Sequence, residues 1–584
     1  MKKGDIFEGK VLKTEFPNKG ILYIEEKRVT VKNALEGQTI RFSITKKRKD
    51  RVEGRLLEVL EPSPLETVGR ENAAGNPAEA DSDGLAAQTD AVAAKAGVAA
   101  VGKTASQNRV CQHFGICGGC AYQTLPYEEQ LALKKRQVED LIKKAGFTFP
   151  VEEIYASPLS RGYRNKMEYT FGDEEKDSPL ALGMHRKNSF YDIVSLKDCH
   201  IADRDFTAIL QAVLHYFTSI GASYYHKMRK EGFLRHLVLR RSVKTGDILV
   251  NLVTTTQAAL DDDAFVNLLT STKIDGKIVG ILHTLNDSPA DVVQSDETRL
   301  LYGQDYFYEY LLNLRFKISP FSFFQTNTLG AEVLYEKVGE YVGDTKDKLI
   351  YDLYTGTGTI AQMMAPYARK VVGVEIVEEA VEAARRNALD NNLTNCEFIA
   401  GDVVKVVDNL TEKPDMIILD PPRDGVNPKA LRKIIRFGVD EMVYVSCKPT
   451  SLMRDLLMLQ EAGYEVKRCC LVDMFPMTTG VETVALLSKG EIDSKKVRVE
   501  FSLEDMDMSG FQKGATYEQI KAYVLEHTGL KVSSLYISQV KRKCRLDVGQ
   551  NYNLSKKEDA KVPQCPPEKE VAIRDALKYF QIIM

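Results

Sequence analysis

A cysteine follows directly after the apolar segment 442–446, where the pattern predicts the end of a strand. Cys447 is next to Lys448, and a neighbouring cation favours the thiolate form of a cysteine. A thiolate at the carboxyl end of a parallel strand would face a ligand crevice, where it can act as a nucleophile. A cysteine at a strand end is more often inert than catalytic, so this interpretation depends on its neighbours.

Two acidic residues end neighbouring predicted strands in the same region. Asp402 follows the segment 397–401, and Asp420 follows the segment 416–419. The carboxyl ends of parallel strands meet at one edge of a sheet, so both carboxylates are expected near Cys447. The two prolines after Asp420 stiffen its loop, which favours a functional role for this residue. Asp402 is equally well explained as a helix cap.

A turn with two glycines, Tyr354–Thr359, joins the apolar segment 349–353 to an expected helix. The next predicted strand, 370–375, ends in Glu375, whose carboxylate could bind ribose hydroxyls. Position 361 is alanine, so the pattern lacks the last glycine of the dinucleotide fingerprint. The combination therefore favours S-adenosylmethionine over NAD as the ligand of this turn.

Four cysteines have the arrangement of a metal centre. Three lie in a Cys-x5-Cys-x2-Cys pattern and one is distant: Cys111, Cys117, Cys120 and Cys199. Two glycines before Cys120 let the backbone wrap tightly around a bound group. Structural zinc usually takes two short pairs of ligands, so this spacing favours a 4Fe-4S cluster over zinc or unrelated thiols. His113 and His200 are alternative ligands, at no better spacing.

The elements that must position these residues indicate a multidomain α/β protein. Residues 326–490 alternate expected strands and helices, which is typical of a doubly wound, Rossmann-like domain. Residues 109–325 mix β-rich runs with helices such as Leu131–Ala145, as expected for an α+β domain around the cysteines. Residues 495–584 are expected to form a helical accessory module, with Ser533 or Ser534 capping one helix.

The first 61 residues contain several short predicted strands, which suggests a small β-barrel. Residues 1–60 hold 15 Lys and Arg against 9 Asp and Glu, and the run 46–49 is entirely basic. Clustered cations of this kind can contact RNA phosphates, although a solvated turn is an equally good explanation. Residues 62–108 are rich in alanine and are expected to form a flexible linker.

The sequence resembles the family of RNA (uracil-5-)-methyltransferases. The matching segments are Ser322–Asn327, Asp352–Gly358, Asp420–Gly425, Ser446–Pro449 and Gly480–Val484. The cysteines resemble those of the ribosomal branch, which modifies uridines of 23S ribosomal RNA. Residues 1–61 resemble the TRAM domain of that branch, an oligonucleotide-binding-like barrel that would bind RNA. The resemblance is weakest over residues 495–584.

The resemblance implies a role for each matching side chain. Attack of the Cys447 thiolate on C6 of uracil would make C5 nucleophilic, and C5 would then take the methyl group. Glu482 would remove the C5 proton before the thiol leaves by elimination. Four residues would contact S-adenosylmethionine: Gln325, Tyr354, Glu375 and Asp420. The basic residues Arg161, Arg164 and Lys166 are candidate RNA contacts, or simply an exposed basic strand.

Composition limits the remaining possibilities. The 584 residues are 44% apolar and 28% charged, with a formal net charge of −3, so global charge does not indicate a nucleic-acid binder. No apolar run of 18 residues and no secretory leader is recognisable, which predicts a cytoplasmic protein without a membrane partner. We expect a monomer that acts on RNA, with 23S ribosomal RNA ahead of transfer RNA and no DNA substrate. A radical enzyme and a non-catalytic RNA-binding factor are the rival interpretations.

Overall fold

The computed structural model describes residues 1–48, 51–67, 110–289, 296–490, 517–528, 530, 532–544 and 565–579. The chain divides into two compact units, Met1–Ser494 and Lys495–Met584. Most of the linker expected at 62–108 lies outside the described residues, from position 68 onward. No helix in the described ranges is long and apolar enough to cross a membrane.

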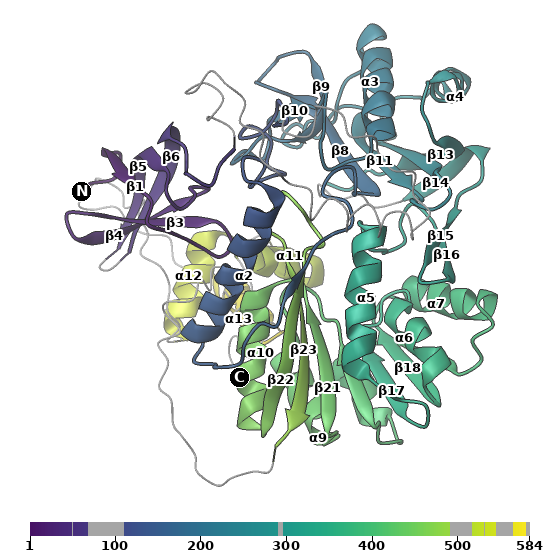
Figure 1. The fold of residues 1–584 in the computed structure, drawn as a ribbon. Coiled ribbons are helices and arrows are strands. Elements are labelled where there is room, and N and C mark those ends of the chain that lie inside the picture. The colour runs from purple at the N-terminus through teal and green to yellow at the C-terminus, as the bar shows by residue number, and fades with distance from the viewer. Residues whose placement is uncertain are drawn as a thin grey trace, which may run out of the picture. The chain divides into compact units, whose positions relative to one another are not determined.

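The N-terminal segment of the first unit forms a six-stranded sheet (Figure 1). Its order is β1-β5-β6-β4-β3-β2. The strands are β1 (Ile6–Lys10), β2 (Lys13–Glu15), β3 (Lys19–Ile24), β4 (Lys27–Lys32), β5 (Thr39–Arg48) and β6 (Arg51–Glu61). Alternate residues such as Val29 and Val31 are fully buried, so one face of the sheet packs a small core of its own. The Tyr122 hydroxyl donates to the carbonyl of Pro17 at 2.7 Å and ties this sheet to the next segment.

The central segment of the first unit contains a seven-stranded sheet covered by two helices. Its order is β10-β9-β8-β11-β12-β13-β14. The elements are β8 (Lys166–Asp173), β9 (Leu180–His185), β10 (Ile193–Ser195), β11 (Leu234–Arg241), β12 (Asp247–Thr254), β13 (Lys277–Leu285), β14 (Glu297–Gly303), α3 (Arg204–Ser219) and α4 (Asp262–Ser271). Asp203 and Asp261 cap the two helices, and Phe206 and Phe265 fill the core between helices and sheet. A hairpin of β15 (Phe307–Leu311) and β16 (Leu314–Ile318) follows.

An eight-stranded sheet forms the Rossmann-like part of the first unit. Its order is β19-β18-β17-β20-β21-β23-β22-β7. The strands are β17 (Leu349–Leu353), β18 (Lys370–Glu375), β19 (Cys396–Ala400), β20 (Met416–Leu419), β21 (Glu441–Ser446), β22 (Tyr464–Val472), β23 (Glu482–Lys489) and β7 (Ile154–Tyr155). The five strands from β17 to β21 run parallel, and β23 runs antiparallel to β21. Chain order therefore reverses between β17 and β20, which creates a crevice at the carboxyl ends of the strands.

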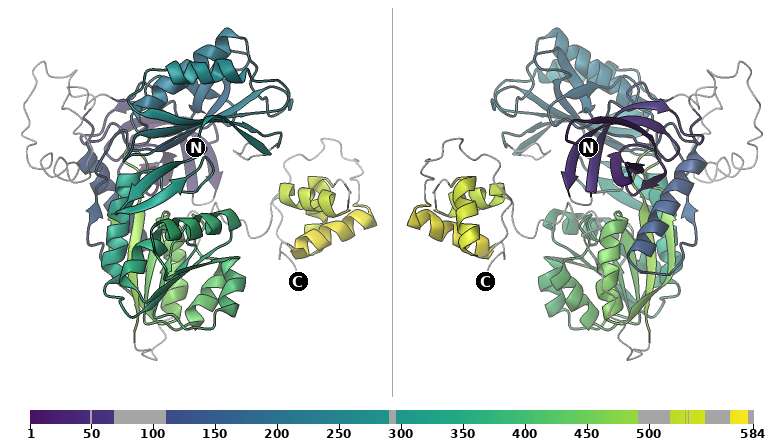
Figure 2. Two further views of the ribbon diagram at one scale, coloured as in Figure 1. Left: turned by 90° about the vertical axis from the view of Figure 1, so that its right-hand side faces the viewer. Right: turned by 90° about the vertical axis from the view of Figure 1, so that its left-hand side faces the viewer.

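Helices lie against both faces of this sheet, as Figures 1 and 2 show. They are α5 (Thr328–Val342), α6 (Thr359–Met364), α7 (Glu378–Asp390), α8 (Val403–Val406), α9 (Pro428–Arg436) and α10 (Pro449–Glu461), with short 3-10 turns η1 (Ala365–Tyr367) and η2 (Val407–Asn409). Strands covered on both faces read as continuous apolar runs, and all four residues of β20 are buried. The sequence therefore predicts the strands of this sheet more readily than the other elements.

Two elements of the segment 109–325 join the Rossmann-like part. The short strand β7 pairs with β22, and α2 (Tyr127–Lys144) packs against α10, although both precede the central sheet in the chain. The sequence indicates a helix over Leu131–Ala145, and α2 begins one turn earlier. The Lys134 ammonium lies 2.7 Å from the Asp473 carboxylate, and both side chains are buried. This ion pair fixes α2 to the loop that precedes β23.

Breaking that buried pair should cost stability. Replacing Lys134 with Met leaves the Asp473 carboxylate buried without its cation, so we expect the free energy of unfolding to fall by about 3–5 kcal/mol. The fall should be visible as a lower thermal midpoint for the first unit. The double variant Lys134→Met with Asp473→Leu removes both charges and should recover part of the loss. Equal midpoints for the single and double variants would contradict this account.

The second unit contains helices with a core of their own. Those within the described residues are α11 (Tyr517–Thr528), α12 (Ser534–Lys543) and α13 (Pro567–Tyr579). Ser533 caps α12 by accepting a hydrogen bond from the Tyr536 amide, in agreement with the sequence. The sequence analysis does not anticipate α13.

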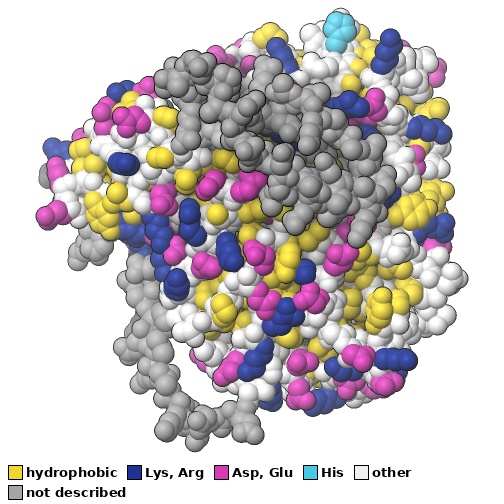
Figure 3. All heavy atoms as spheres, viewed as in Figure 1, with side chains coloured by type: hydrophobic (Ala, Val, Ile, Leu, Met, Phe, Trp, Pro, Cys, Tyr) yellow, Lys and Arg dark blue, Asp and Glu magenta, His cyan; other side chains and the backbone are white. Residues whose placement is uncertain are grey.

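Charged side chains of both signs are mixed on the face that Figure 3 shows. Among the residues coloured in Figure 3, basic and acidic groups are interspersed rather than gathered by sign. This agrees with a formal net charge of −3 over the whole chain. Recognition of a polyanion would therefore depend on local groups of cations rather than on the field of the whole molecule.

Candidate active site

The end of β21 and the start of β23 bring together the two candidate catalytic residues. Cys447 follows the last residue of β21, and Glu482 is the first residue of β23. These strands are antiparallel neighbours, and Ser446 is paired with Thr483. The pairing therefore sets Cys447 and Glu482 next to one another at the carboxyl edge of the sheet. Asp420 follows β20, the other neighbour of β21, and lies at the same edge.

These groups form one electrostatic cluster. Burial raises the pKa of Glu482 to about 8, with Asp420 adding to the shift and the Arg423 guanidinium opposing it. Burial also raises the pKa of Asp420 to about 7, with a smaller contribution from Asp352. A carboxylate with a pKa near neutrality can both accept and release a proton during turnover.

The surroundings of the Cys447 thiol favour its neutral form. Burial raises its pKa to about 11, and the nearby Glu482 and Asp420 carboxylates add to the shift. The cation that opposes these effects is Arg423, whereas the sequence suggests Lys448. Lys448 instead occupies the cap position of α10. Burial and the acidic neighbours therefore favour the neutral thiol of Cys447, whereas Arg423 favours its thiolate.

The loop that carries Arg423 is held by α10. The Ser451 hydroxyl donates to the Arg423 carbonyl at 3.0 Å. The buried Asp455 carboxylate accepts from the Val426 amide at 2.7 Å and from the Tyr444 hydroxyl at 2.6 Å. Sequence reasoning gives Asp455 no role, although an acidic residue on the apolar face of an expected helix is a visible signal. These contacts fix the loop that positions Arg423.

Backbone amides in and just after the glycine turn donate hydrogen bonds to two carboxylates. Glu375 accepts a hydrogen bond from the Gly356 amide at 3.1 Å, and Asp352 accepts one from the Ala361 amide at 3.0 Å. Tyr354 has a φ of 69°, a conformation that is uncommon for a residue with a bulky side chain. The turn thus presents Tyr354 and Glu375 at the ends of neighbouring strands.

Gly358 is required by the packing behind this turn. A Cβ at this position would lie 2.6 Å from the Phe398 ring, which is closer than any real contact. Its φ of 74° is also one that residues with side chains rarely adopt. The second glycine of the motif therefore serves the fold of the turn.

Asp402 has the more ordinary of its two predicted roles. Its carboxylate accepts a hydrogen bond from the Val404 amide at 2.9 Å and caps α8. One carboxylate oxygen is therefore used locally. Asp420 differs, because it is half-buried and interacts electrostatically with Cys447 and Glu482.

Gln325 is positioned by the central segment. The side-chain amide of Asn165 donates to the Gln325 carbonyl at 3.0 Å and to the Thr328 hydroxyl at 2.8 Å. Asn327 then donates to the Met474 carbonyl at 2.9 Å, in the loop that leads to Glu482. Two buried asparagines therefore join the segment of Gln325 to both neighbouring parts of the first unit. Sequence reasoning assigns no role to either, because their partners are remote in the chain.

A buried tyrosine on α5 completes the surroundings. Tyr335 is 4% exposed and hydrogen-bonds the Gln325 side chain. Burial raises its pKa far above the ordinary value, and the Asp420, Glu482 and Asp352 carboxylates act in the same direction. Tyr335 is therefore neutral and contributes a hydroxyl rather than a charge to this edge of the sheet.

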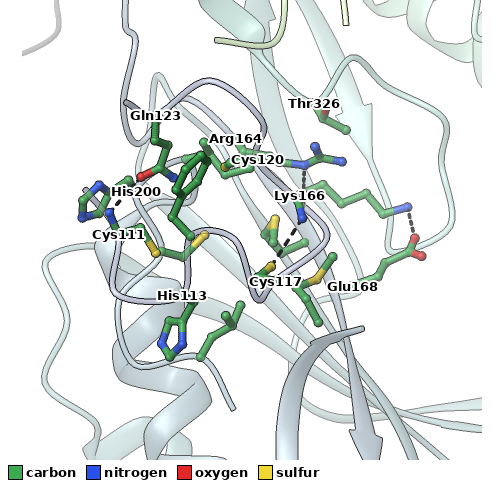
Figure 4. Close-up of a pocket in the computed structure, with 17 residues that line it drawn as sticks. Cys111, His113, Cys117, Cys120, Gln123, Arg164, Lys166, Glu168, His200 and Thr326 are labelled. Atoms are coloured by element: carbon green, nitrogen blue, oxygen red, sulfur yellow. Dashed lines mark hydrogen bonds and ion pairs between the residues drawn. The ribbon is translucent and has the colours of Figure 1, made fainter. Parts of the chain in front are cut away.

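The four candidate cysteine ligands line one cavity of about 320 Å³ (Figure 4). Burial raises the pKa of all four thiols, that of Cys120 to about 12. The Gly119 amide donates to the Cys117 sulfur at 3.4 Å, and the Cys111 thiol donates to the Asp198 carbonyl at 3.0 Å. In the described part of the chain, no three His, Cys, Asp or Glu side chains form a group that could hold a metal ion.

The basic residues proposed as RNA contacts lie around this cavity. Arg164 and Lys166 line it, and Lys166 forms an ion pair with Glu168. Arg161 lies 2.7 Å from a ring nitrogen of His200, which also lines the cavity. These cations therefore face the cysteines at least in part, rather than forming a separate exposed strand.

Comparisons with known proteins show which family this chain resembles. Residues 126–490 match the tRNA (uracil-5-)-methyltransferase family. An uncharacterized RNA methyltransferase of Clostridium tetani is 46% identical over 493 residues, covering 84% of this chain and 99% of the relative. One from Clostridium acetobutylicum is 44% identical over 490 residues, with the same 84% and 99% coverage.

A solved structure has the same overall arrangement. It is the tRNA (uracil-54, C5)-methyltransferase of Pyrococcus abyssi in complex with S-adenosyl-L-homocysteine. It superposes with a TM-score of 0.62 at 26% sequence identity, and the match covers 82% of this chain and all of that chain. The family match spans the central sheet and the complete edge of the Rossmann-like sheet with Cys447 and Glu482. The chain therefore belongs to the tRNA (uracil-5-)-methyltransferase family.

Proposed function

We propose that this protein methylates C5 of a specific uridine in 23S ribosomal RNA, using S-adenosylmethionine as the methyl donor. The observation that carries the proposal is the juxtaposition of Cys447 and Glu482 on paired strands beside Asp420. A nucleophile and a buried carboxylate are the two groups that substitution at C5 of uracil requires. Membership of the family supports the reaction class.

In the proposed reaction the Cys447 thiol loses its proton to solvent, and the resulting thiolate adds to C6 of the uracil ring. As the S–C6 bond forms, the electrons of the C5–C6 double bond move toward the C4 carbonyl, so C5 becomes nucleophilic. Arg423, which favours the thiolate, would assist this step. S-adenosylmethionine supplies an electrophilic methyl group on a sulfonium centre. C5 takes that methyl group, and the carbon–sulfur bond of the donor breaks.

Glu482 would complete the reaction. Its carboxylate removes the C5 proton, the C5–C6 double bond reforms, and the bond from C6 to the Cys447 sulfur breaks. A buried carboxylate with its pKa raised to about 8 is a stronger base than an exposed one. The target base must leave its stack to reach Cys447, which costs a few kcal/mol.

The donor site would be formed at the crevice between β17 and β20. Four residues would contact S-adenosylmethionine: Gln325, Tyr354, Glu375 and Asp420. Glu375 ends β18, where a carboxylate can reach ribose hydroxyls, and Tyr354 can pack on adenine. The half-buried Asp420 would face a positively charged ligand, which would favour its ionised form.

The cysteine cavity would hold a 4Fe-4S cluster through Cys111, Cys117, Cys120 and Cys199. The four thiols line one cavity, and iron would balance the charge of thiolates that burial otherwise disfavours. The cluster would be structural, because the amides of Ala121 and Tyr122 donate to the Met477 carbonyl at 2.8 and 3.0 Å, in the loop that leads to β23.

Removing one ligand should therefore have two effects. Cys120→Ser is expected to lose iron and acid-labile sulfide, and to lower the thermal midpoint of the first unit. Cys544→Ser, in the second unit, is the matched control and should retain both. Iron and sulfide analysis of the anaerobically purified proteins measures the result directly. Full iron and sulfide content in Cys120→Ser would exclude this cysteine as a ligand.

The six-stranded N-terminal sheet would act as a TRAM-like barrel that binds RNA, and the protein would work as a cytoplasmic monomer. Transfer RNA is the alternative substrate, because the Pyrococcus abyssi structure is that of a tRNA methyltransferase. Labelled S-adenosylmethionine with unmodified 23S ribosomal RNA and with bulk transfer RNA decides between them. Label at uridine C5 of only one RNA identifies the substrate. No label on either RNA would overturn the proposed function.

A further inference from the structure

Four large apolar side chains are exposed together on the central segment. Phe190 and Tyr191 lie in the turn between β9 and β10, and their exposed fractions are 84% and 59%. Met228, in the turn before β11, is 72% exposed, and Ile116, in the loop of the cysteines, is 47% exposed. None of the four lines the cavity of Figure 4. Grouped apolar exposure of this kind marks an interaction site.

The four side chains belong to one surface, which we call the aromatic platform. The Tyr191 hydroxyl lies 3.9 Å from the Met228 sulfur. The Lys227 ammonium donates to the Phe190 carbonyl at 3.4 Å, so the two turns are in direct contact. The Lys187 amide donates to the Ile116 carbonyl at 2.7 Å and attaches the first turn to the cysteine loop.

Both turns are held by hydrogen bonds. In the first, the Ser189 hydroxyl accepts from the Tyr191 and Asp192 amides at 3.2 and 3.1 Å. In the second, the His226 amide donates to the Glu231 carbonyl at 2.7 Å, and the His226 carbonyl accepts from the Lys230 amide at 2.7 Å. The fold therefore presents the platform side chains from turns that are already formed, which reduces the entropy lost on binding.

The two turns of the platform carry more cations than acidic residues, and the neighbouring segment 173–177 carries four acidic residues. The segments 186–192 and 226–231 contain five Lys and Arg against two Asp and Glu. One of these cations, Arg229, forms an ion pair of 3.7 Å with Asp177. Aromatic rings next to positive charge are the usual surface for single-stranded nucleic acid, because bases stack on the rings and phosphates meet the cations.

We propose that the aromatic platform binds a single-stranded segment of the RNA substrate, with bases stacked on Phe190 and Tyr191. The proposal deepens the proposed function and rests on it, because it takes RNA as the substrate. Lys227 and Lys230 would meet the phosphates of the same segment. The platform lies outside the catalytic edge of the sheet, so it would select and hold RNA without taking part in methyl transfer.

The test compares aromatic with aliphatic side chains. In the full-length protein, the double variant Phe190→Leu with Tyr191→Leu keeps apolar surface but loses the ring faces. We expect it to bind unmodified 23S ribosomal RNA, or transfer RNA if that is the substrate, about tenfold or more weakly. The Michaelis constant for RNA should rise accordingly, while kcat at saturating RNA and the affinity for S-adenosylmethionine stay unchanged.

Two matched controls accompany it. Phe190→Tyr with Tyr191→Phe keeps both rings and should bind RNA as the wild type does. Tyr367→Leu removes another exposed ring, 64% exposed, from the Rossmann-like part and should have no effect. Wild-type affinity in the leucine variant would overturn the platform alone. A wild-type protein that binds and methylates neither RNA would overturn the proposed function, and the platform with it.

Discussion

Cys447→Ala is expected to transfer no methyl group to uridine, with a loss of rate on the order of 10⁴-fold or more. The reason is chemical, because C5 of uracil becomes nucleophilic only after a nucleophile has added at C6. Cys447 is the thiol at the edge of the sheet that adjoins Glu482 and Asp420. Methyl transfer from labelled S-adenosylmethionine to unmodified RNA measures the effect.

The matched control is Cys396→Ala. Cys396 is a half-buried thiol at the opposite end of the same sheet, at the start of β19, and its removal should leave methyl transfer unchanged. Binding of S-adenosylhomocysteine should persist in Cys447→Ala, which separates a lost nucleophile from a misfolded donor site. Methylation at the wild-type rate in Cys447→Ala would refute the covalent mechanism.

Glu482→Gln is expected to stop the reaction one step later. Addition and methyl transfer can proceed, but the C5 proton stays in place, so the methylated RNA remains bonded to Cys447. The rate of product release should fall by roughly 10²–10⁴-fold. A protein–RNA adduct that carries the label and survives denaturing electrophoresis would report the trapped intermediate. Rapid turnover without such an adduct would show that another group removes the proton.

The pH dependence of product release in the wild type tests the role of Glu482 independently. Glu482 acts as a base only when ionised, and burial raises its pKa to about 8. Release of the product in a single turnover should therefore speed up as the pH rises from about 6 to about 8, and level off above it. Glu482→Gln should lack this increase with pH.

The sequence predicts those parts of the site that depend on local pattern. Strands buried on both faces are continuous apolar runs, so the places of Glu375, Asp420 and Cys447 at strand ends can be anticipated. The pairing of β23 with β21, which brings Glu482 to Cys447, depends on contacts between remote segments. In the sequence, only the family resemblance indicates a role for Glu482. A local sequence pattern does not determine which remote strands pair.

The roles of Asp455, Asn165 and Arg423 cannot be predicted from the sequence either, because they also depend on contacts between remote segments. The role of Asp455 requires its partners on β21 and in the loop after β20, and that of Asn165 requires the segment around Gln325. The sequence suggests that Lys448, next to Cys447, lowers the pKa of the thiol. In the structure Arg423, from the loop after another strand, has this effect. These roles depend on residues that are close in space. The order of strands in the sheet determines those spatial neighbours, and closeness in sequence does not.

The position of β7 determines where the chain can be truncated or recombined without exposing a strand edge. β7 pairs with β22 at the edge of the eight-stranded sheet and α2 packs against α10, although both precede the central sheet in the chain. A fragment starting at residue 326 would lack that outer strand and would expose the edge of β22 to pairing with other chains. Recombination at this point should therefore give insoluble products, and the central segment is best regarded as an insertion within a single discontinuous domain.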